Sequence, residues 1–265
     1  MATATSGRTT AKTPAKAKRS STLAIDIGGT GLKASVLDAA GKMLADRVRV
    51  PTTYPVTPTQ LVEQLTALVA PLPASSRVSV GFPGVVRRGC VLTAPHLETK
   101  AGPGSAVSLV LRKQWTGFDL AGALATSLGK PVRVINDADL QGLDVMTGRG
   151  VEVVVTLGTG FGTAVFDHGR LSAHLELSQH PFRHDETYDE QLGDAARKQV
   201  GNKTWNRRVA RAIATLDTLL VFDHLYLGGG NVRHLKLTLP ANVTVIDPNA
   251  GILGGLRLWE LDAVS

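Results

Sequence analysis

One short stretch of the chain joins a carboxylate to a turn rich in glycine. The apolar residues Leu23–Ile25 are followed by Asp26 and, after Ile27, by Gly28–Gly31, and then apolar and polar residues alternate again. Glycine has no Cβ, so such a turn lets backbone N–H groups approach an anion closely. A carboxylate at the mouth of the turn could hold Mg²⁺ on a bound phosphate. The stretch therefore predicts a strand, a phosphate-binding turn and a second strand.

A second copy of this plan lies roughly half a chain later. Val153–Leu157 is apolar apart from Thr156, which stands where Asp26 stands in the first copy, and Gly158–Gly162 forms the turn. Two such turns at equivalent places favour duplicated halves that face one cleft, although two ordinary hairpins are the alternative. The candidate phosphate-binding residues are Asp26, Gly28, Gly29, Thr30, Gly31 and Lys33 in the first copy and Thr156, Gly158, Thr159, Gly160 and Gly162 in the second.

The rest of the chain divides into segments with helix and strand periodicity. We expect a helix that begins at Thr57–Pro58, since proline is accepted in the first turn, and ends before Pro71. We also expect helices over 119–128, 188–200, 205–222 and 252–260, and strands over 43–50, 77–82, 131–135 and 225–227. These elements must position the two turns and the residues that follow the strands.

Composition limits the class of protein. At 265 residues the chain is long enough for two small domains, and its hydrophobic share of 43% suits a globular enzyme. Cys90 is the one cysteine, so no intramolecular disulfide can form, which fits a reducing compartment. There is neither a signal-peptide pattern nor an apolar run of about 18 residues, so we expect a cytoplasmic protein without a membrane span.

The net charge of +7 is concentrated near the N-terminus. Residues 1–22 carry five basic residues and no acidic one, which leaves 24 basic and 22 acidic residues in the remaining chain. This segment is rich in Ala, Thr, Ser and Lys and has no periodicity, so we interpret it as a disordered basic tail. The tail is either simply solvated or makes loose contacts with polyanions. It is too short for a helix-turn-helix, so we expect no DNA partner.

Five motifs in order resemble the ROK family of sugar kinases. They are DIGGTGLK from Asp26, FPG from Phe82, Asn136-Asp137-Ala138, LGTGFGT from Leu157 and LGGGN from Leu227. HPFR from His180 and TWNRRV from Thr204 resemble the small branch of that family that contains polyphosphate glucokinases. The resemblance covers about residues 23–259. It implies the actin-like ATPase (ribonuclease H-like) fold, an α/β architecture with two duplicated domains around a cleft, here 23–135 with the C-terminal helix 251–265, and 136–250.

The resemblance also implies roles for single residues. Asp137 would be the catalytic base for the sugar hydroxyl, and an ordinary carboxylate with a pKa of about 3.9 is adequate because the proton leaves late in a loose transition state. Asn136 would hold the sugar through its amide, although Asn and Asp also favour helix caps. The candidate sugar-binding residues are Gly84, His96, Asn136, Glu176, Gln179, His180 and Asp189. Gly228, Gly229, Gly230 and Asn231 would contact the donor, and Asp26 would bind Mg²⁺.

Three positions on the sugar side depart from the family pattern. Gln179 stands where the family has histidine, Asp189 where it has glutamate, and His96 where asparagine is usual. Asp189 is one methylene shorter than glutamate, and a missing or stretched hydrogen bond to a sugar hydroxyl strongly affects discrimination. The phosphate turns keep the pattern. The kinase fold therefore follows more firmly from the residues than the identity of the sugar does.

The sequence thus predicts a hexose kinase that uses polyphosphate or ATP with Mg²⁺, has no structural zinc and is a homodimer by resemblance. The alternatives are a degenerate relative that binds sugar without turnover and another ATPase of the same fold. Two segments stay open. Residues 99–114 are either a tolerated surface loop or a lid, and the helical stripe Lys203, Arg207 and Arg211 is either solvated or a polyphosphate track.

Overall fold

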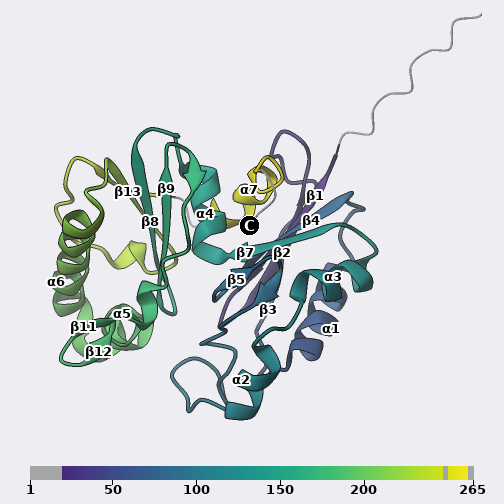
Figure 1. The fold of residues 1–265 in the computed structure, drawn as a ribbon, viewed down its shortest axis with the longest axis horizontal. Coiled ribbons are helices and arrows are strands. Elements are labelled where there is room, and N and C mark those ends of the chain that lie inside the picture. Colours follow the sequence, from purple (N-terminus) through teal and green to yellow (C-terminus); the bar gives the residue numbers. More distant parts are fainter. Residues whose placement is uncertain (1–19, 247–249, 262–265) are drawn as a thin grey trace, which may run out of the picture.

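The structure is a computed structural model that describes residues 20–246 and 250–261. In this part of the chain, two five-stranded sheets form two lobes with helices between and outside them (Figure 1). The first sheet has the order β3 (Val48–Val50), β2 (Leu32–Leu37), β1 (Thr22–Ile27), β4 (Arg77–Phe82) and β7 (Val132–Asn136). The second has the order β10 (Arg170–Leu171), β9 (Phe161–Asp167), β8 (Val151–Leu157), β13 (His224–Gly228) and β14 (Val243–Val245).

The two sheets repeat one topology. In each, the first strand pairs antiparallel with the second and parallel with the fourth, so β1, β2 and β4 correspond to β8, β9 and β13. Each glycine-rich turn joins the first strand to the second. Asp26 pairs with Gly81 of β4, and Thr156 pairs with Gly228 of β13, so these residues occupy equivalent places. The predicted duplication of two α/β halves is confirmed.

The outer face of the first sheet is covered by two helices, α1 (Pro58–Val69) and α3 (Leu120–Leu128). Thr57 caps α1 in a capping box with Gln60, and Pro58 is its first residue, as expected. Asp119 caps α3 by accepting the N–H of Gly122. The core under these helices also buries Trp115 of α2 (Leu109–Trp115), which follows the 99–108 loop.

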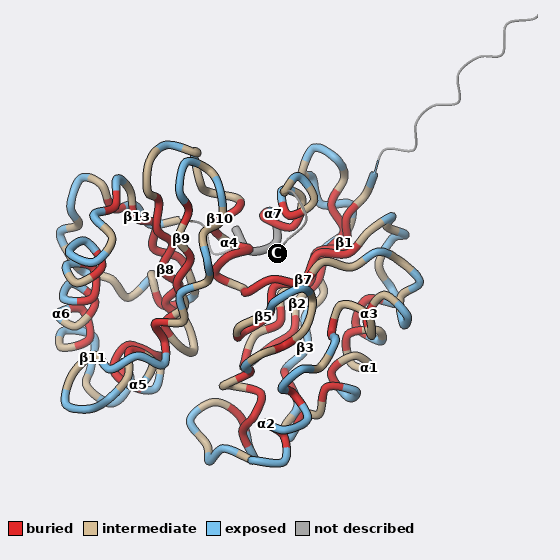
Figure 2. Tube along the Cα trace, in the orientation of Figure 1, coloured by how far each residue is buried: buried red, intermediate tan, exposed pale blue. Residues whose placement is uncertain are grey.

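Two helices lie between the sheets, α4 (Asp137–Val145) and α7 (Ala250–Arg257) (Figures 1 and 2). α7 packs on the first sheet, where Ser79 Oγ donates to the carbonyl of Gly255, and on α4, where Arg257 Nη1 donates to the carbonyl of Leu143. A Cβ at Gly254 would lie 1.8 Å from the Leu140 carbonyl oxygen, so only glycine allows this close approach. The expected packing of the C-terminal helix on the first half is observed, although the helix begins at Ala250 and ends at Arg257.

The outer face of the second sheet is covered by α6 (Asp194–Leu220), and α5 (Tyr188–Leu192) precedes it. The predicted helix over 188–200 is wrong in its bounds, because the chain breaks at Gly193 and then continues as α6. Gly201, at φ 75°, kinks α6 where we expected two separate helices. The shorter elements are β5 (Val86–Arg87), β6 (Cys90–Val91), β11 (Pro181–Arg183), β12 (Glu186–Thr187), and the 3₁₀ turns η1 (Leu177–Gln179) and η2 (Val232–His234).

Two further bounds differ from expectation. The strand predicted over 43–50 is confined to Val48–Val50, and Met43 makes only an isolated bridge to Leu37. β1 begins at Thr22, and the Ser21 carbonyl already accepts hydrogen bonds from the backbone N–H and the hydroxyl of Ser76, so the structured part of the chain begins before Leu23. The remainder of the predicted tail, 1–19, lies outside the described residues. None of the helices in the described ranges is long and apolar enough to cross a bilayer.

Candidate active site

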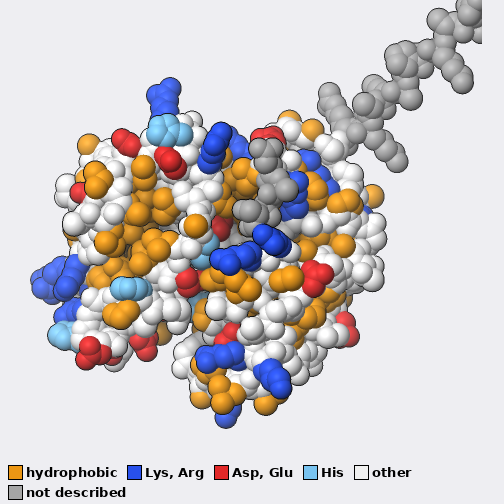
Figure 3. All heavy atoms as spheres, viewed as in Figure 1, with side chains coloured by type: hydrophobic (Ala, Val, Ile, Leu, Met, Phe, Trp, Pro, Cys, Tyr) orange, Lys and Arg blue, Asp and Glu red, His pale blue; other side chains and the backbone are white. Residues whose placement is uncertain are grey.

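A pocket lies between the two lobes, at the ends of β7, β8 and β9 (Figure 3). From the first half it is lined by Gly84 and His96 and, where β7 passes into α4, by Asn136 and Asp137. From the second half it is lined by Thr156, Gly158, Thr159, Gly160, Gly162, Glu176, Ser178 and Asp189. Residues that are about 100 positions apart in the sequence therefore share one surface, and most of them are predicted site residues.

Other predicted residues lie outside this lining. Gln179 and His180 are exposed; the Gln179 amide donates to Ser178 Oγ, and His180 Nδ1 lies 3.2 Å from the carbonyl of Pro181. The first glycine-rich turn with Asp26 and Lys33, and the Gly228–Asn231 loop, are also outside the lining of the pocket. The structure thus separates the sugar-side candidates into a group in the pocket and a pair, Gln179 and His180, on the surface next to it.

Asn136 is both the last residue of β7 and the N-cap of α4. Its Oδ1 accepts the N–H groups of Ala138 (2.8 Å) and Asp139 (3.3 Å), and its Nδ2 donates to the carbonyl of Gly84 (3.1 Å). Asn136 therefore both caps α4 and lines the pocket. Because the amide oxygen already serves the helix, the amide can offer a ligand one remaining N–H rather than a donor–acceptor pair.

Asp137 is the first residue of α4 and faces the pocket. Burial, followed by the negative charge of Asp26, raises the pKa of Asp137 to about 7, while the N–H of Ala138 acts in the opposite direction. Glu176 and Asp139 add further negative charge. A carboxyl group with this pKa changes charge near neutral pH, as a general base requires.

The first glycine-rich turn is braced from two directions. Thr52 Oγ1 donates to the carbonyl of Gly28 (2.7 Å), and the Tyr54 hydroxyl donates to that of Gly29 (2.6 Å). Burial raises the pKa of Tyr54 to about 12, so this hydroxyl keeps its proton. Pro103 packs against Gly29, where a Cβ would lie 2.9 Å from its Cγ. The 99–108 loop thus rests on the turn itself.

Asp26 and Lys33 are cross-strand neighbours in the hairpin that carries this turn. Lys33 Nζ donates to Asp26 Oδ2 at 2.8 Å. The negative charge of Asp26 also reaches Asp137, since it is the second cause of the raised pKa of that residue. Mg²⁺ is typically bound by one or two carboxylates together with substrate phosphates, and Asp26 supplies one carboxylate, which is paired with Lys33 in this structure. The residues present therefore fit Mg²⁺ at Asp26.

The second glycine-rich turn is held by residues from three elements. Asp189 Oδ1 accepts the N–H of Phe161 (2.6 Å), and a Cβ at Gly160 would lie 2.5 Å from this oxygen. The N–H of Asp194, at the start of α6, bonds to the carbonyl of Gly158 (3.1 Å). Asn231 Nδ2 donates to the same carbonyl (2.9 Å), so the LGGGN loop supports the turn from behind. The turn is therefore a rigid feature of the pocket.

His96 and Asp189 meet across the pocket. His96 Nε2 lies 3.5 Å from Asp189 Oδ2, although one residue belongs to the first lobe and the other to the second. Burial raises the pKa of Asp189, and the proximity of His96 acts against this rise. Two of the three departures from the family pattern are thus in contact with each other. His96 is longer than the asparagine of the family pattern, and it approaches the carboxylate of Asp189, which is shorter than the glutamate of that pattern.

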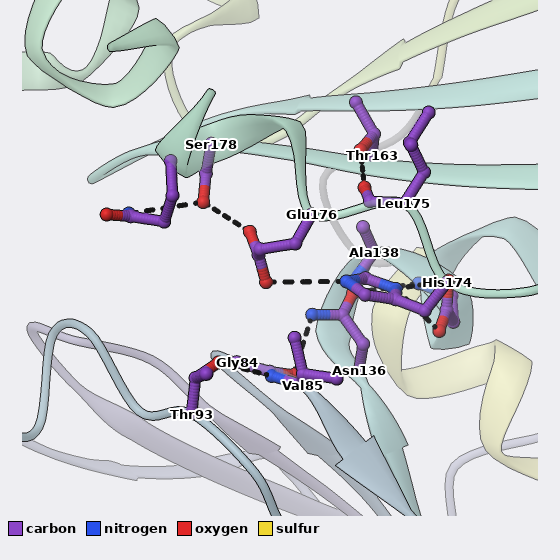
Figure 4. A network of polar contacts seen from close by, with 12 residues as sticks. Gly84, Val85, Thr93, Asn136, Ala138, Thr163, His174, Leu175, Glu176 and Ser178 are labelled. Carbon is purple, nitrogen blue, oxygen red and sulfur yellow. Dashed lines mark hydrogen bonds and ion pairs between the residues drawn. The ribbon is translucent and has the colours of Figure 1, made fainter. Parts of the chain in front are cut away.

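A network of acidic side chains and one histidine supports the Glu176 side of the pocket (Figure 4). His174 lies between Asp139 of α4 (3.2 Å) and Glu176 (3.4 Å), and Ser178 Oγ donates to the other oxygen of Glu176. These bonds lower the pKa of Glu176 against the effect of its burial. Burial alone would lower the pKa of His174, but its bonds to Asp139 and Glu176 and their negative charges raise it to about 10.

Sequence reasoning missed His174, Asp139 and Ser178. Asp139 directly follows the predicted Asn136-Asp137-Ala138 motif, and His174 and Ser178 flank Glu176 at a spacing of two, so proximity in sequence to predicted residues was the available signal. In the described residues no group of three or more His, Cys, Asp or Glu side chains has the geometry of a metal site.

The duplicated sheets, the helices between them and the pocket with its glycine-rich turn and carboxylates define an α/β protein of the actin-like ATPase fold. The chain belongs to the ROK family, because the model of that family matches residues 22–173, which is more than half of it.

Individual relatives extend the similarity over almost the whole chain. The polyphosphate glucokinase of Mycobacterium tuberculosis strain H37Rv is 28% identical over 269 residues, which cover 94% of each chain. The solved inorganic polyphosphate/ATP-glucomannokinase of Arthrobacter sp. strain KM is 29% identical, with a TM-score of 0.77 over 90% of this chain and 98% of the other. The ROK family glucokinase of Streptomyces griseus, solved with glucose and AMPPNP, shares the fold at 19% identity and a TM-score of 0.70, over 90% of this chain and 98% of that one.

Proposed function

We propose that the protein is a hexose kinase that transfers a phosphoryl group from polyphosphate or ATP to the primary hydroxyl of glucose or a related hexose. The observation that carries the proposal is the position of Asp137, which shares a pocket with the second glycine-rich turn and with the carboxylates of Glu176 and Asp189. The similarity to polyphosphate glucokinases and to a polyphosphate/ATP-glucomannokinase supports the same class of donor and acceptor.

Asp137 is the proposed base. Its carboxylate would accept the proton of the attacking hydroxyl, and the pKa of about 7 makes it a stronger base than an ordinary aspartate. Phosphoryl transfer depends mainly on in-line positioning and on charge neutralisation. Backbone N–H groups of the turns at Gly28–Gly31 and Gly158–Gly162 would provide part of that neutralisation, and Lys33 would add a positive charge once it leaves Asp26.

Asp26 is the residue that would hold Mg²⁺, with Asp137 close enough to sense its charge. The metal, when bound, would neutralise charge on the donor phosphates. The sugar side of the pocket would be formed by carboxylates that accept hydrogen bonds and by one N–H group that donates one. Glu176 and Asp189 would accept hydrogen bonds from sugar hydroxyls, and Asn136 would donate its remaining N–H. His96 would set the geometry of Asp189 from the opposite lobe.

A grid of product assays tests the proposal. Glucose, mannose and glucosamine are each combined with ATP and with polyphosphate in the presence of Mg²⁺, and the sugar phosphate is measured directly. Turnover of a hexose with either donor supports the proposal, and the donor that is used shows whether the kinase depends on ATP, on polyphosphate or on both. Sugar binding by thermal shift without turnover in any combination would contradict it and would favour a ROK protein that binds sugar without phosphorylating it.

A further inference from the structure

His174 lies behind the wall of the pocket rather than in it. Its ring connects α4 to the segment between β10 and η1, which also carries Glu176 (Figure 4). The side chains of His174 and Asp139 are 14% and 6% exposed, whereas Glu176, at 25%, reaches the pocket. The segment is held from the other side as well, because Thr163 Oγ1 of β9 donates to the carbonyl of Leu175 (2.5 Å).

The hydrogen-bond partners of His174 determine how many protons the network can hold. Nδ1 lies 3.3 and 3.2 Å from the two oxygens of Asp139, and Nε2 lies 3.4 Å from Glu176 Oε2. A neutral imidazole has one N–H and one lone pair, and a carboxylate only accepts. With both carboxylates ionised, a neutral ring would point a lone pair at one of them. Three arrangements avoid this: a doubly protonated ring, a neutral ring beside a protonated Asp139, or a neutral ring beside a protonated Glu176.

We propose that His174 is a permanent imidazolium that positions Glu176 for the acceptor hydroxyl and compensates the buried charge of Asp139. The role in sugar binding rests on the proposed function, whereas the charge state of the ring does not. Glu176 is then held at both oxygens, by His174 Nε2–H and by the Ser178 hydroxyl, and stays ionised. Each oxygen retains a lone pair for a sugar hydroxyl.

The charges around the ring agree with this arrangement. Asp139 faces it from α4, and Glu176 faces it from its own segment. Farther out, Asp137 adds negative charge near both carboxylates, and His96 faces Glu176 across the pocket. Burial raises the pKa of Asp139, and the hydrogen bond and positive charge of His174 act against this rise. The raised pKa of His174 agrees with a ring that keeps both protons at neutral pH.

Nitrogen-15 NMR of the histidine rings tests the charge state without any assay of activity. The full chain contains seven histidines. At about pH 8.5 an ordinary histidine with a pKa near 6.5 is neutral. We expect one ring to keep both nitrogens in the imidazolium range and its signal to be lost in His174→Asn. His168→Asn is the matched control, because His168 also contacts an aspartate, Asp167, but is exposed; the imidazolium signal should persist in it.

Two spectra would overturn the proposal. In one, every histidine ring is neutral at this pH, which would place the proton on Asp139 or Glu176 or show that the network holds none. In the other, an imidazolium signal survives His174→Asn. If His174→Asn fails to fold, Asp139→Asn/His174→Asn removes the buried charge together with its counter-ion, and the same loss of signal is expected in that variant.

The positioning role is tested by measuring the KM for the sugar and the KM for the donor separately. Loss of a hydrogen bond to a charged group should raise the sugar KM of His174→Asn by about 10- to 100-fold. The donor KM should stay close to that of the wild type, because His174 is on the Glu176 side of the pocket. A sugar KM that does not change, or a donor KM that rises equally, contradicts the role. If no sugar is phosphorylated by the wild type, the proposed function fails, but the NMR result still decides the charge state.

Discussion

Asp137 combines two properties that act against each other. Its burial near Asp26, Glu176 and Asp139 makes it a suitable base, because the pKa of about 7 lies near physiological pH. The same surroundings make its ionised form unfavourable in the folded protein. Catalytic groups are often placed in this way, at a cost in stability.

The pH dependence of catalysis follows from this pKa. The base must be ionised to accept a proton, so kcat/KM for the sugar should be high above about pH 7 and should fall as the pH drops through that value. A pH profile of kcat/KM for the sugar, measured under saturating donor, checks this in the enzyme–donor complex. A profile that stays flat down to pH 5 would contradict the assignment of Asp137 as the base.

The stability of the protein should show the opposite trend. The folded pKa of Asp137 is raised to about 7 from 3.8, so the folded state binds a proton that the unfolded state has lost, and stability falls as the pH rises between these values. Asp137→Asn removes this cost. We expect the variant to melt at a higher temperature than the wild type at pH 8 and at a similar temperature near pH 4. A variant that is less stable at pH 8 would contradict the account.

At the residue scale, the sequence predicted those features that depend on near neighbours. The Asn136-Asp137 pair was predicted both as a cap and as a site, and it is an N-cap that lines the pocket. The bridge of His174 was not predictable in this way. Its partner Asp139 is 35 positions away, and the contact depends on tertiary packing, in which α4 lies beside β9.

At the scale of elements, α4 and α7 determine how the lobes are joined. The carbonyl of Leu140 in α4 occupies the space in which a side chain at position 254 would lie. We expect Gly254→Ala to lower the free energy of unfolding by about 1–3 kcal/mol, although alanine is the better helix former. Gly255→Ala is the matched control, because a Cβ there meets only the side chains of Ala24 and Ser79 at 3.1 and 3.2 Å. Equal stability of the two variants in urea unfolding would disprove the close-approach argument.

The pair of His96 and Asp189 links two elements of different lobes. If the contact at 3.5 Å contributes to the geometry of the pocket, the effects of His96→Asn and Asp189→Asn should not be additive. Residues in direct contact typically show coupling energies of about 0.5–3 kcal/mol. A double-mutant cycle on kcat/KM for the sugar measures this quantity. Additive effects would mean that the two residues act independently and that the contact does not matter for turnover.

Element bounds were predicted well where local signals are strong and poorly where tertiary packing decides. Thr57 and Pro58 fixed the start of α1 because a cap and a first-turn proline act locally. The alternation over 43–50 predicted a long strand, but only Val48–Val50 finds a partner strand in β2. The predicted break after position 200 coincides with the kink at Gly201, whereas the break at Gly193 is one that periodicity alone does not reveal.

At the scale of the whole molecule, duplication explains why the chain has two glycine-rich turns at equivalent places, the second of which lines the pocket. The equivalent strand orders place each turn at the same end of its sheet, and the lobes face each other so that the ends of β7 and β8 share a surface. The sequence predicted the two equivalent turns from the repeated motif, but only the second of them lines the pocket. It did not predict that the 99–108 loop rests on the first turn, since the contact of Pro103 with Gly29 joins distant parts of the chain.

The basic residues of α6 belong to the same scale. Lys203, Arg207 and Arg211 are exposed on the outer face of the second lobe, and Arg211 lies over the ring of Phe182 at 5.5 Å. If this stripe carries a long polyphosphate, Lys203→Ser/Arg207→Ser should raise the KM for long-chain polyphosphate and leave that for ATP unchanged, and the effect should weaken with added salt. Equal KM values for polyphosphate in the variant and the wild type would show that the stripe is only solvated.

The most direct test of the account is phosphorus-31 NMR of the product formed from a hexose and the working donor, with the wild type and Asp137→Asn compared at equal sugar occupancy. We expect the wild type to form the ester of the primary hydroxyl. We expect Asp137→Asn to bind the sugar and to form the same ester about 10²- to 10⁴-fold more slowly. Product formed by Asp137→Asn at the wild-type rate, or phosphorylation of a different hydroxyl, would contradict the claim that this pocket transfers phosphate with Asp137 as its base.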